Sequence, residues 1–147
     1  GFIAGALAVL VFHQGVVAIF YLVLDGPRAP YNLTPTAPFG IPAVVSSAFF
    51  GGLWGAVMLD VIRDRLAQRS AWIVGIVFGA LLPSAIALFV VFPLRGQPVA
   101  GGWQATIIGF ALLVNGAWGL GTVLIANALR RLGLSREQSA GGQSSPR

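Results

Sequence analysis

The chain contains 147 residues, of which 56% are hydrophobic and 9% are charged, and it carries a formal net charge of +5. Water-soluble domains contain roughly a quarter charged residues, so this composition excludes an ordinary soluble protein and indicates a membrane protein. The absence of cysteine excludes disulfides, thiolate metal sites and cysteine catalysis, and the few charges do not form the basic patch that binding to nucleic acid requires.

Four apolar stretches are each long enough to cross a bilayer. They run at about residues 2–24, 41–62, 71–92 and 103–129. Each meets the ~20 apolar residues that ~30 Å of hydrocarbon requires. We therefore expect an all-α membrane protein, a four-transmembrane-helix bundle that occupies residues 1–134. The first stretch is expected to be a retained helix and not a signal peptide, because it has no small-x-small cleavage site before a polar segment.

The first span contains His13, the only histidine of the chain. An ionisable residue at membrane depth is expensive, so it is a functional hypothesis by default. On an ideal helix His13 lies about 120° from a stripe of small residues. This stripe consists of Gly1, Gly5, Ala8 and Gly15. Either the first span packs on two sides, or His13 faces a partner protein, a lipid headgroup or a pigment.

A neutral imidazole such as that of His13 could ligate the iron of haem or the magnesium of a chlorophyll. Bis-histidine haem would need a second histidine, which the sequence lacks. Lipid, a quinone or a tetrapyrrole pigment are the conceivable ligands near His13. The alternative is a structural role, in which the imidazole is hydrogen-bonded inside the bundle or to a neighbouring subunit. Gln14 follows directly but points about 100° away around the helix.

The connection at residues 25–40 is rich in proline, which fixes φ and removes backbone donors, so it can be neither a helix nor a central strand. It also contains apolar residues that a solvated linker would not need, among them Tyr31, Leu33 and Phe39. We infer an ordered, extended periplasmic cap over the outer ends of the helices. The alternative is a stiff connector with incidental apolar residues.

Small residues recur at helical spacing in every span, where they allow close packing of backbones. The predicted packing positions are Gly5, Gly15, Gly52, Gly55, Gly75, Gly79, Gly116 and Gly119, with Gly51 and Gly109 beside them. These stripes could equally dock other subunits. The second and fourth spans share a Gly-x-Trp-Gly element at residues 52–55 and 116–119, which suggests two duplicated helical hairpins.

Few polar groups interrupt the remaining spans. Asp60 is expected to form an ion pair with Arg63 at the membrane interface, since a transport carboxylate would lie deeper. In the fourth span, Asn115 and Thr122 belong to a polar strip, and Asn115 is the predicted donor of an interhelical hydrogen bond. The sequence contains no paired carboxylates, metal-ligand cluster or nucleophile motif. We therefore do not expect an enzyme.

The distribution of arginine predicts the orientation of the chain. All nine basic residues are arginine, a bias typical of a GC-rich bacterial genome, and seven of them lie between spans two and three or after span four. The positive-inside rule then places both termini in the cytoplasm of a multi-pass protein of the bacterial inner membrane. The small and polar segment 135–147 is predicted to be a flexible cytoplasmic tail.

Three segments in the first 60 residues resemble a family of small four-span proteobacterial inner-membrane proteins. They are Phe12-His13-Gln14-Gly15, the loop sequence PTAPFGIP at residues 35–42, and AFFGGLWG at residues 48–55. The resemblance implies the four-span fold. The family has no established activity, so the resemblance assigns no site.

These observations favour a non-catalytic accessory or assembly subunit of a larger energy-converting or transport complex, with other membrane subunits and lipids as partners. The first alternative is a small carrier or channel, alone or as a homodimer, with a hydrated path lined by Asn115, Thr122 and His13. The second is a pigment, quinone or haem binder that uses His13.

Overall fold

Four long apolar helices make up most of the computed structural model, which describes residues 1–26, 28–66, 68 and 70–141. Within these ranges, four helices are long and apolar enough to cross a membrane, and they occupy Phe2–Val23, Ala43–Val61, Ala71–Leu94 and Ala105–Gly133. The predicted all-α, four-span architecture is confirmed, and the chain is a multi-pass membrane protein by the length and composition of these helices.

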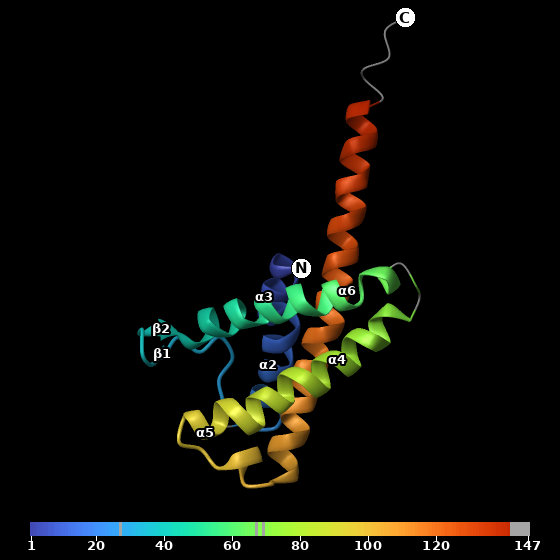
Figure 1. The fold of residues 1–147 in the computed structure, drawn as a ribbon. Coiled ribbons are helices and arrows are strands. Elements are labelled where there is room, and N and C mark those ends of the chain that lie inside the picture. The colour runs from blue at the N-terminus through green and yellow to red at the C-terminus, as the bar shows by residue number, and fades with distance from the viewer. Residues whose placement is uncertain (27, 67, 69, 142–147) are drawn as a thin grey trace, which may run out of the picture.

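The first and third spans are composite, because a π-helical turn interrupts each of them (Figure 1). The helices are α1 (Phe2–Ala8), α2 (Gln14–Val23), α3 (Ala43–Val61), α4 (Ala71–Ile86), α5 (Phe92–Leu94) and α6 (Ala105–Gly141). The π-helical turns are η1 (Val9–His13) and η3 (Ala87–Val91), and the 3₁₀ turns are η2 (Arg63–Arg65) and η4 (Val99–Gly101). Two short antiparallel strands, β1 (Pro35–Thr36) and β2 (Ile41–Pro42), pair in the first loop.

Several span boundaries differ from the sequence prediction, and the starts of two spans differ for identifiable reasons. The second span begins at Ala43 and not at Ile41, because Ile41 pairs with Thr36 between the two strands. The fourth begins at Ala105, since Trp103 has a positive φ of 61° that a helix does not permit. It then continues to Gly141, through residues with good helix propensity. The predicted tail therefore starts inside a helix, and residues 142–147 lie outside the described residues.

The four spans form two antiparallel pairs. Helix α1 packs mainly against α3, and α4 packs along α6, whereas α3 and α4 contact each other little. In Figure 1, α3 crosses the span formed by α1 and α2 instead of running alongside it. The C-terminal part of α6 extends well beyond the other helices in the same view.

In the first pair, α1 and α3 cross where glycines bring their backbones into contact. A Cβ built on Gly5 would lie 2.8 Å from the Cα of Gly55 and would overlap the carbonyl oxygen of Gly51. Gly52 lies beside this crossing, against the ring of Phe2. Only glycine allows such an approach, because neither backbone can move aside as a flexible side chain would.

The second pair contains an equivalent crossing of α4 and α6. A Cβ on Gly75 would lie 2.8 Å from the carbonyl oxygen of Gly119, and a Cβ on Gly79 would lie 3.1 Å from the Cα of Gly119. Gly116 faces the same interface but has more room, since its Cβ would lie 3.6 Å from the Cβ of Ala80. The tight contact in this pair therefore centres on Gly119.

Gly15 is expected to continue the stripe of the first span, but it does not pack against another described helix of this chain. Apart from its own turns of helix, no described atom lies within 4 Å of the position that a Cβ of Gly15 would take. The reason is the π-helical turn η1, which adds a residue to one turn and shifts everything after it relative to Gly5. Gly109 likewise has no described neighbour within 4 Å of the position that a Cβ would take.

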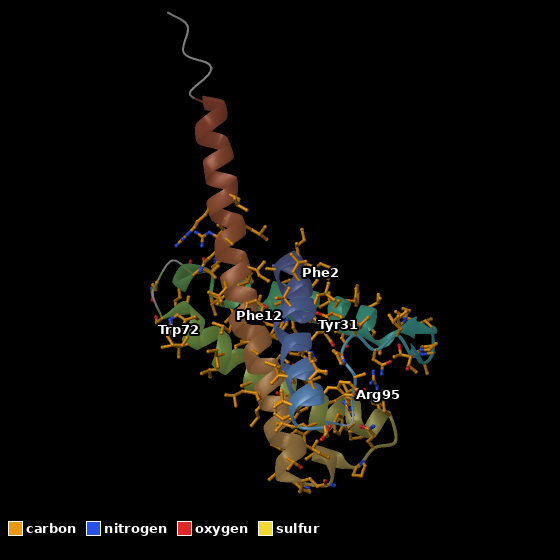
Figure 2. The ribbon with its side chains drawn as sticks, turned by 180° about the vertical axis from the view of Figure 1, so that it is seen from behind. Phe2, Phe12, Tyr31, Trp72 and Arg95 are labelled. Atoms are coloured by element: carbon orange, nitrogen blue, oxygen red, sulfur yellow. The ribbon has the colours of Figure 1, made fainter. Side chains whose placement is uncertain are left out.

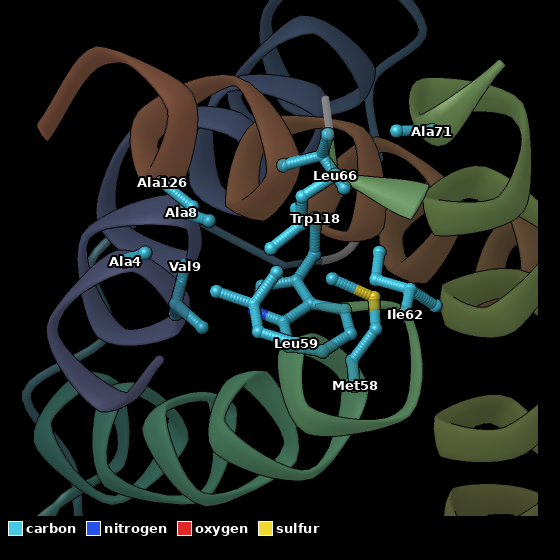
Figure 3. Close-up of a cluster of buried hydrophobic side chains, with 11 residues drawn as sticks. Ala4, Ala8, Val9, Met58, Leu59, Ile62, Leu66, Ala71, Trp118 and Ala126 are labelled. Carbon is cyan, nitrogen blue, oxygen red and sulfur yellow. The ribbon is translucent and has the colours of Figure 1, made fainter. Parts of the chain in front are cut away.

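A tryptophan from each pair joins the two pairs together. Trp118 of α6 is buried among residues of α1, η1 and α3, including Ala8, Val9 and Met58 (Figure 3). Trp54 of α3 makes the converse contact, an edge-to-face packing on Phe78 of α4 with the ring centroids 6.2 Å apart. Both are the tryptophans of the Gly-x-Trp-Gly elements.

Candidate functional site around His13 and the first loop

The candidate site lies where η1 interrupts the hydrogen-bond pattern of the first span. The N–H of Gln14 donates to the carbonyls of Val9 and Val11, five and three residues earlier, and not to that of Leu10 as it would in an α-helix. The Leu10 carbonyl instead accepts a hydrogen bond from the hydroxyl of Tyr31, at 2.8 Å. A side chain of the first loop thus completes the backbone pairing of a transmembrane helix.

Tyr31 is attached to the first span by its main chain as well. Its backbone N–H donates to Oε1 of Gln14 at 2.8 Å, and the Gln14 side chain is buried. Tyr31 has a positive φ of 52°, an uncommon conformation for a bulky residue. The intramembrane amide of Gln14 therefore holds the loop in place.

These contacts place the loop beside the middle of the first span. Leu10 and Val23 are 13 residues apart, which corresponds to about 20 Å along a helix. Figure 2 shows Tyr31 beside this span near the level of Phe12. The backbone carbonyl of Thr34 then accepts the N–H of Ala43 at 3.0 Å, and that of Asn32 accepts the N–H of Val44 at 2.9 Å. These are the first two N–H groups of α3.

The prediction of a cap over the outer ends of the helices is therefore corrected. The loop is ordered, but it runs back along the first span, so that α3 begins beside the middle of this span, near Leu10. The physical reason is the pair of bonds from Tyr31, together with the need of the first N–H groups of α3 for acceptors.

His13 is the last residue of η1. Its Nδ1 atom is buried and has no hydrogen-bond partner among the described residues. A buried polar atom that lacks a partner costs free energy in any apolar environment. The 100°-per-residue projection used for His13 does not hold across η1, for the same reason that it failed for Gly15.

The first span packs on two sides, which was one of the two alternatives considered for the surroundings of His13. One side meets α3 at Gly5, and the other meets α6. Phe12 lies against α6 so closely that a Cβ on Gly121 would overlap its ring. Further along, Phe20 packs edge-to-face on Phe110 with the ring centroids 5.0 Å apart.

The two polar residues predicted on the fourth span, Asn115 and Thr122, are bonded within the helices and do not join His13. The amide Nδ2 of Asn115 donates to Oγ of Ser84 on α4, and this hydroxyl donates onward to the carbonyl of Ala111, both at 3.0 Å. Thr122 is fully buried and donates to the carbonyl of Trp118 at 2.9 Å. Gln14, Asn115 and Thr122 thus bond to three different neighbours.

At the predicted cytoplasmic end, Arg63 lies 4.0 Å from Asp60 and 3.8 Å from Asp64, and all three side chains are largely exposed. Such exposed pairs contribute little to stability. The described residues hold no group of three or more His, Asp or Glu side chains that could bind a metal ion.

Sequence reasoning missed three residues that organise this region: Tyr31, Ser84 and the buried Trp118. The burial of Trp118 could have been predicted, since this residue lies between Gly116 and Gly119, two of the predicted packing positions. Ser84 follows Pro83 in an apolar helix, where a hydroxyl needs a partner. Tyr31 was noted only as an apolar loop residue, and no spacing rule connects it with Leu10.

Comparisons with protein-family models, with curated proteins and with solved structures gave no match to this chain.

Proposed function

We propose that this chain is a non-catalytic accessory or assembly subunit of a larger complex in the bacterial inner membrane, with both termini in the cytoplasm. The complex would be an energy-converting or transport assembly. The observation that supports this proposal is the course of the first loop, which lies beside the middle of the first span through the two bonds of Tyr31.

Irregular backbone that faces lipid is not tolerated within the hydrocarbon of a bilayer, because its unpaired N–H and C=O groups have no partners there. Asn32, Leu33 and Thr34 are nevertheless exposed, and so is Phe39, at 83%. The five prolines between residues 27 and 42 have no backbone N–H group, which reduces the number of unpaired donors in this segment. Their backbone carbonyl groups remain and still need hydrogen-bond donors. Another protein that covers this side of the molecule would shield the loop from lipid and supply partners for its unpaired backbone groups.

Photo-crosslinking in native membranes tests the proposal. A photoreactive amino acid at Leu33 or Phe39 is expected to give one discrete adduct with another membrane protein, which should also co-purify in fixed stoichiometry in mild detergent. Leu81 of α4 and Leu113 of α6 are also exposed, at 58% and 50%, and serve as control positions. Crosslinks to lipid alone at Leu33 and Phe39 would contradict the proposal.

The alternative of a carrier or channel receives less support. Its hydrated path was expected to follow Asn115, Thr122 and His13, but Thr122 is fully buried and both Asn115 and Thr122 are bonded to protein groups. An adduct of twice the chain mass in the crosslinking experiment would favour the homodimeric form of this alternative.

One observation favours a second candidate function, the binding of a lipid-soluble ligand by His13. Its buried Nδ1 lacks a partner among the described residues, which costs about 1–3 kcal/mol for a typical polar group. A quinone carbonyl or a tetrapyrrole could bind this nitrogen after a change of conformation that uncovers it, because atoms of the chain itself cover Nδ1 in this structure. The test is an absorption spectrum and extracted-quinone analysis of protein purified from native membranes, compared with His13→Ala. Identical results from both proteins would exclude this function.

A further inference from the structure

We propose that Tyr31 is a positioning residue that holds the first span in its π-helical form and thereby sets the orientation of His13. In this role the first loop and the intramembrane imidazole form one conformational unit. This inference goes beyond membership of a complex and does not depend on it.

The first step concerns the Leu10 carbonyl, which has two possible donors. In a regular α-helix it would accept the N–H of Gln14, four residues later. In this structure that N–H is shared between the carbonyls of Val9 and Val11, and the hydroxyl of Tyr31 takes its place on Leu10 at 2.8 Å. An unpaired carbonyl in an apolar environment is costly. Loss of the hydroxyl therefore favours the return of the Gln14 N–H to Leu10, which converts the π-helical turn into an α-helix.

The second step concerns Gln14, which accepts one of the two bonds of Tyr31 and is also the residue whose N–H the Leu10 carbonyl lacks. Its main-chain N–H is the donor that the π-helical turn diverts from Leu10, and its side-chain Oε1 accepts the N–H of Tyr31 at 2.8 Å. A change of backbone register at Gln14 moves this side chain and breaks its bond to the loop. The bonds at Leu10, Gln14 and Tyr31 must therefore form and break together.

The third step connects this change to His13. A π-helical turn contains one residue more than the α-helical turn that it replaces, so closing it rotates the following residues by about 100° relative to the preceding ones. The preceding part is fixed at Gly5, whose backbone is in contact with that of α3. His13 is the last residue of η1 and must move when the turn closes. Loss of the hydrogen bonds of Tyr31 therefore changes the orientation of the His13 imidazole.

The chain suits a direct test, because it has one histidine and two tyrosines. Protein labelled with ¹⁵N-histidine and reconstituted in lipid bilayers gives imidazole signals from His13 alone in solid-state NMR. The variant Tyr31→Phe removes the hydroxyl and keeps the ring. Tyr21→Phe is the matched control, since Tyr21 lies on the exposed side of α2.

We expect Tyr31→Phe to shift both imidazole ¹⁵N signals. In a second sample labelled uniformly with ¹³C and ¹⁵N, the backbone shifts of Leu10 and Gln14 should move toward α-helical values. Tyr21→Phe should leave all of them as in the wild type. Wild-type signals in Tyr31→Phe, or equal shifts in the two variants, would overturn the proposal.

A second pair of variants covers the case in which Tyr31→Phe does not fold. 4-Aminophenylalanine at position 31 restores a hydrogen-bond donor, whereas 4-methylphenylalanine has nearly the same size and no donor. The amino variant should retain the wild-type spectrum of His13 and the methyl variant should not. Identical spectra from these two proteins would show that the ring acts by packing alone, and the proposal would be wrong.

Discussion

The indole N–H of Trp118 donates a hydrogen bond of 3.0 Å to the carbonyl of Gly5, which joins residues 113 positions apart in the chain. Gly5 is also the residue at which the backbones of α1 and α3 meet. One glycine therefore serves two interfaces, because the absence of a side chain leaves its carbonyl accessible to the tryptophan of the other helix pair.

We expect Trp118→Phe to lower the free energy of unfolding by about 1–3 kcal/mol. The substitution removes a buried interhelical hydrogen bond, worth roughly 1 kcal/mol, and leaves a space beside Met58. Steric trapping or forced unfolding in bicelles measures the change. Trp103→Phe is the control, since Trp103 is 69% exposed. Equal losses from the two variants would contradict the assigned role of Trp118.

Alanine at two glycines of the first span should have opposite effects. Gly5→Ala must separate α1 from α3, since its Cβ would meet backbone atoms, and overpacking of this kind costs roughly 1–3 kcal/mol or more. Gly15→Ala has open space and should be neutral, or stabilising by up to about 1 kcal/mol through helix propensity. Unfolding in bicelles checks both. A destabilising Gly15→Ala would show that Gly15 packs against something absent from the isolated chain.

The same comparison on α6 tests the second crossing. Gly119→Ala should destabilise the pair of α4 and α6 strongly, because its Cβ would overlap the carbonyl of Gly75. Gly116→Ala should be tolerated, since its Cβ would make an ordinary contact of 3.6 Å with Ala80. Crosslinking of cysteines placed on α4 and α6 reports their separation in a chain that has no cysteine of its own. Equal crosslinking in the two variants would refute the close contact.

The hydrogen bond between Asn115 and Ser84 should appear in a double-mutant cycle. We expect a coupling of about 0.6 kcal/mol, and at most about 1.7 kcal/mol, between Ser84→Ala and Asn115→Leu, which are the mean and the maximum found for interhelical hydrogen bonds in a membrane protein. Ser84→Ala alone should cost more than Asn115→Leu alone, because Ser84 also donates to Ala111. The free energies of unfolding of the three variants give the answer. Strict additivity would mean that the two side chains do not interact.

The orientation predicted from arginine can be tested with two matched cysteines. Gln68→Cys lies in the connection predicted to be cytoplasmic, and Gln97→Cys lies in the connection predicted to be periplasmic. An impermeant maleimide added to intact spheroplasts should label position 97 only, and position 68 should react only after lysis. The reverse pattern would invert the topology.

The sequence was sufficient for the four spans, because their length and apolarity follow directly from the thickness of a bilayer. It also identified most of the glycines at the two crossings, among them Gly5, Gly55, Gly75 and Gly119. Spacing rules assume a regular helix, and they failed at Gly15 because η1 adds a residue to the turn before it.

The contacts of Tyr31 could not be predicted, since no local pattern specifies that a loop residue pairs with the Leu10 carbonyl. The failure at Gly15 and the missed role of Tyr31 have the same origin. A hydrogen bond between distant parts of the chain stabilises a helix geometry that local propensity does not favour. The environment of His13 depends on that geometry and was therefore outside the reach of a helical projection.

The two tryptophan contacts between the helix pairs have a consequence for the order of assembly. Each hairpin already contains its own glycine crossing, Gly5 with Gly55 in one and Gly75 with Gly119 in the other. Between the hairpins, Trp54 reaches Phe78 and Trp118 reaches Gly5. We therefore expect each hairpin to insert and pair with itself first, and the two hairpins to dock later, when each contributes one indole to the other.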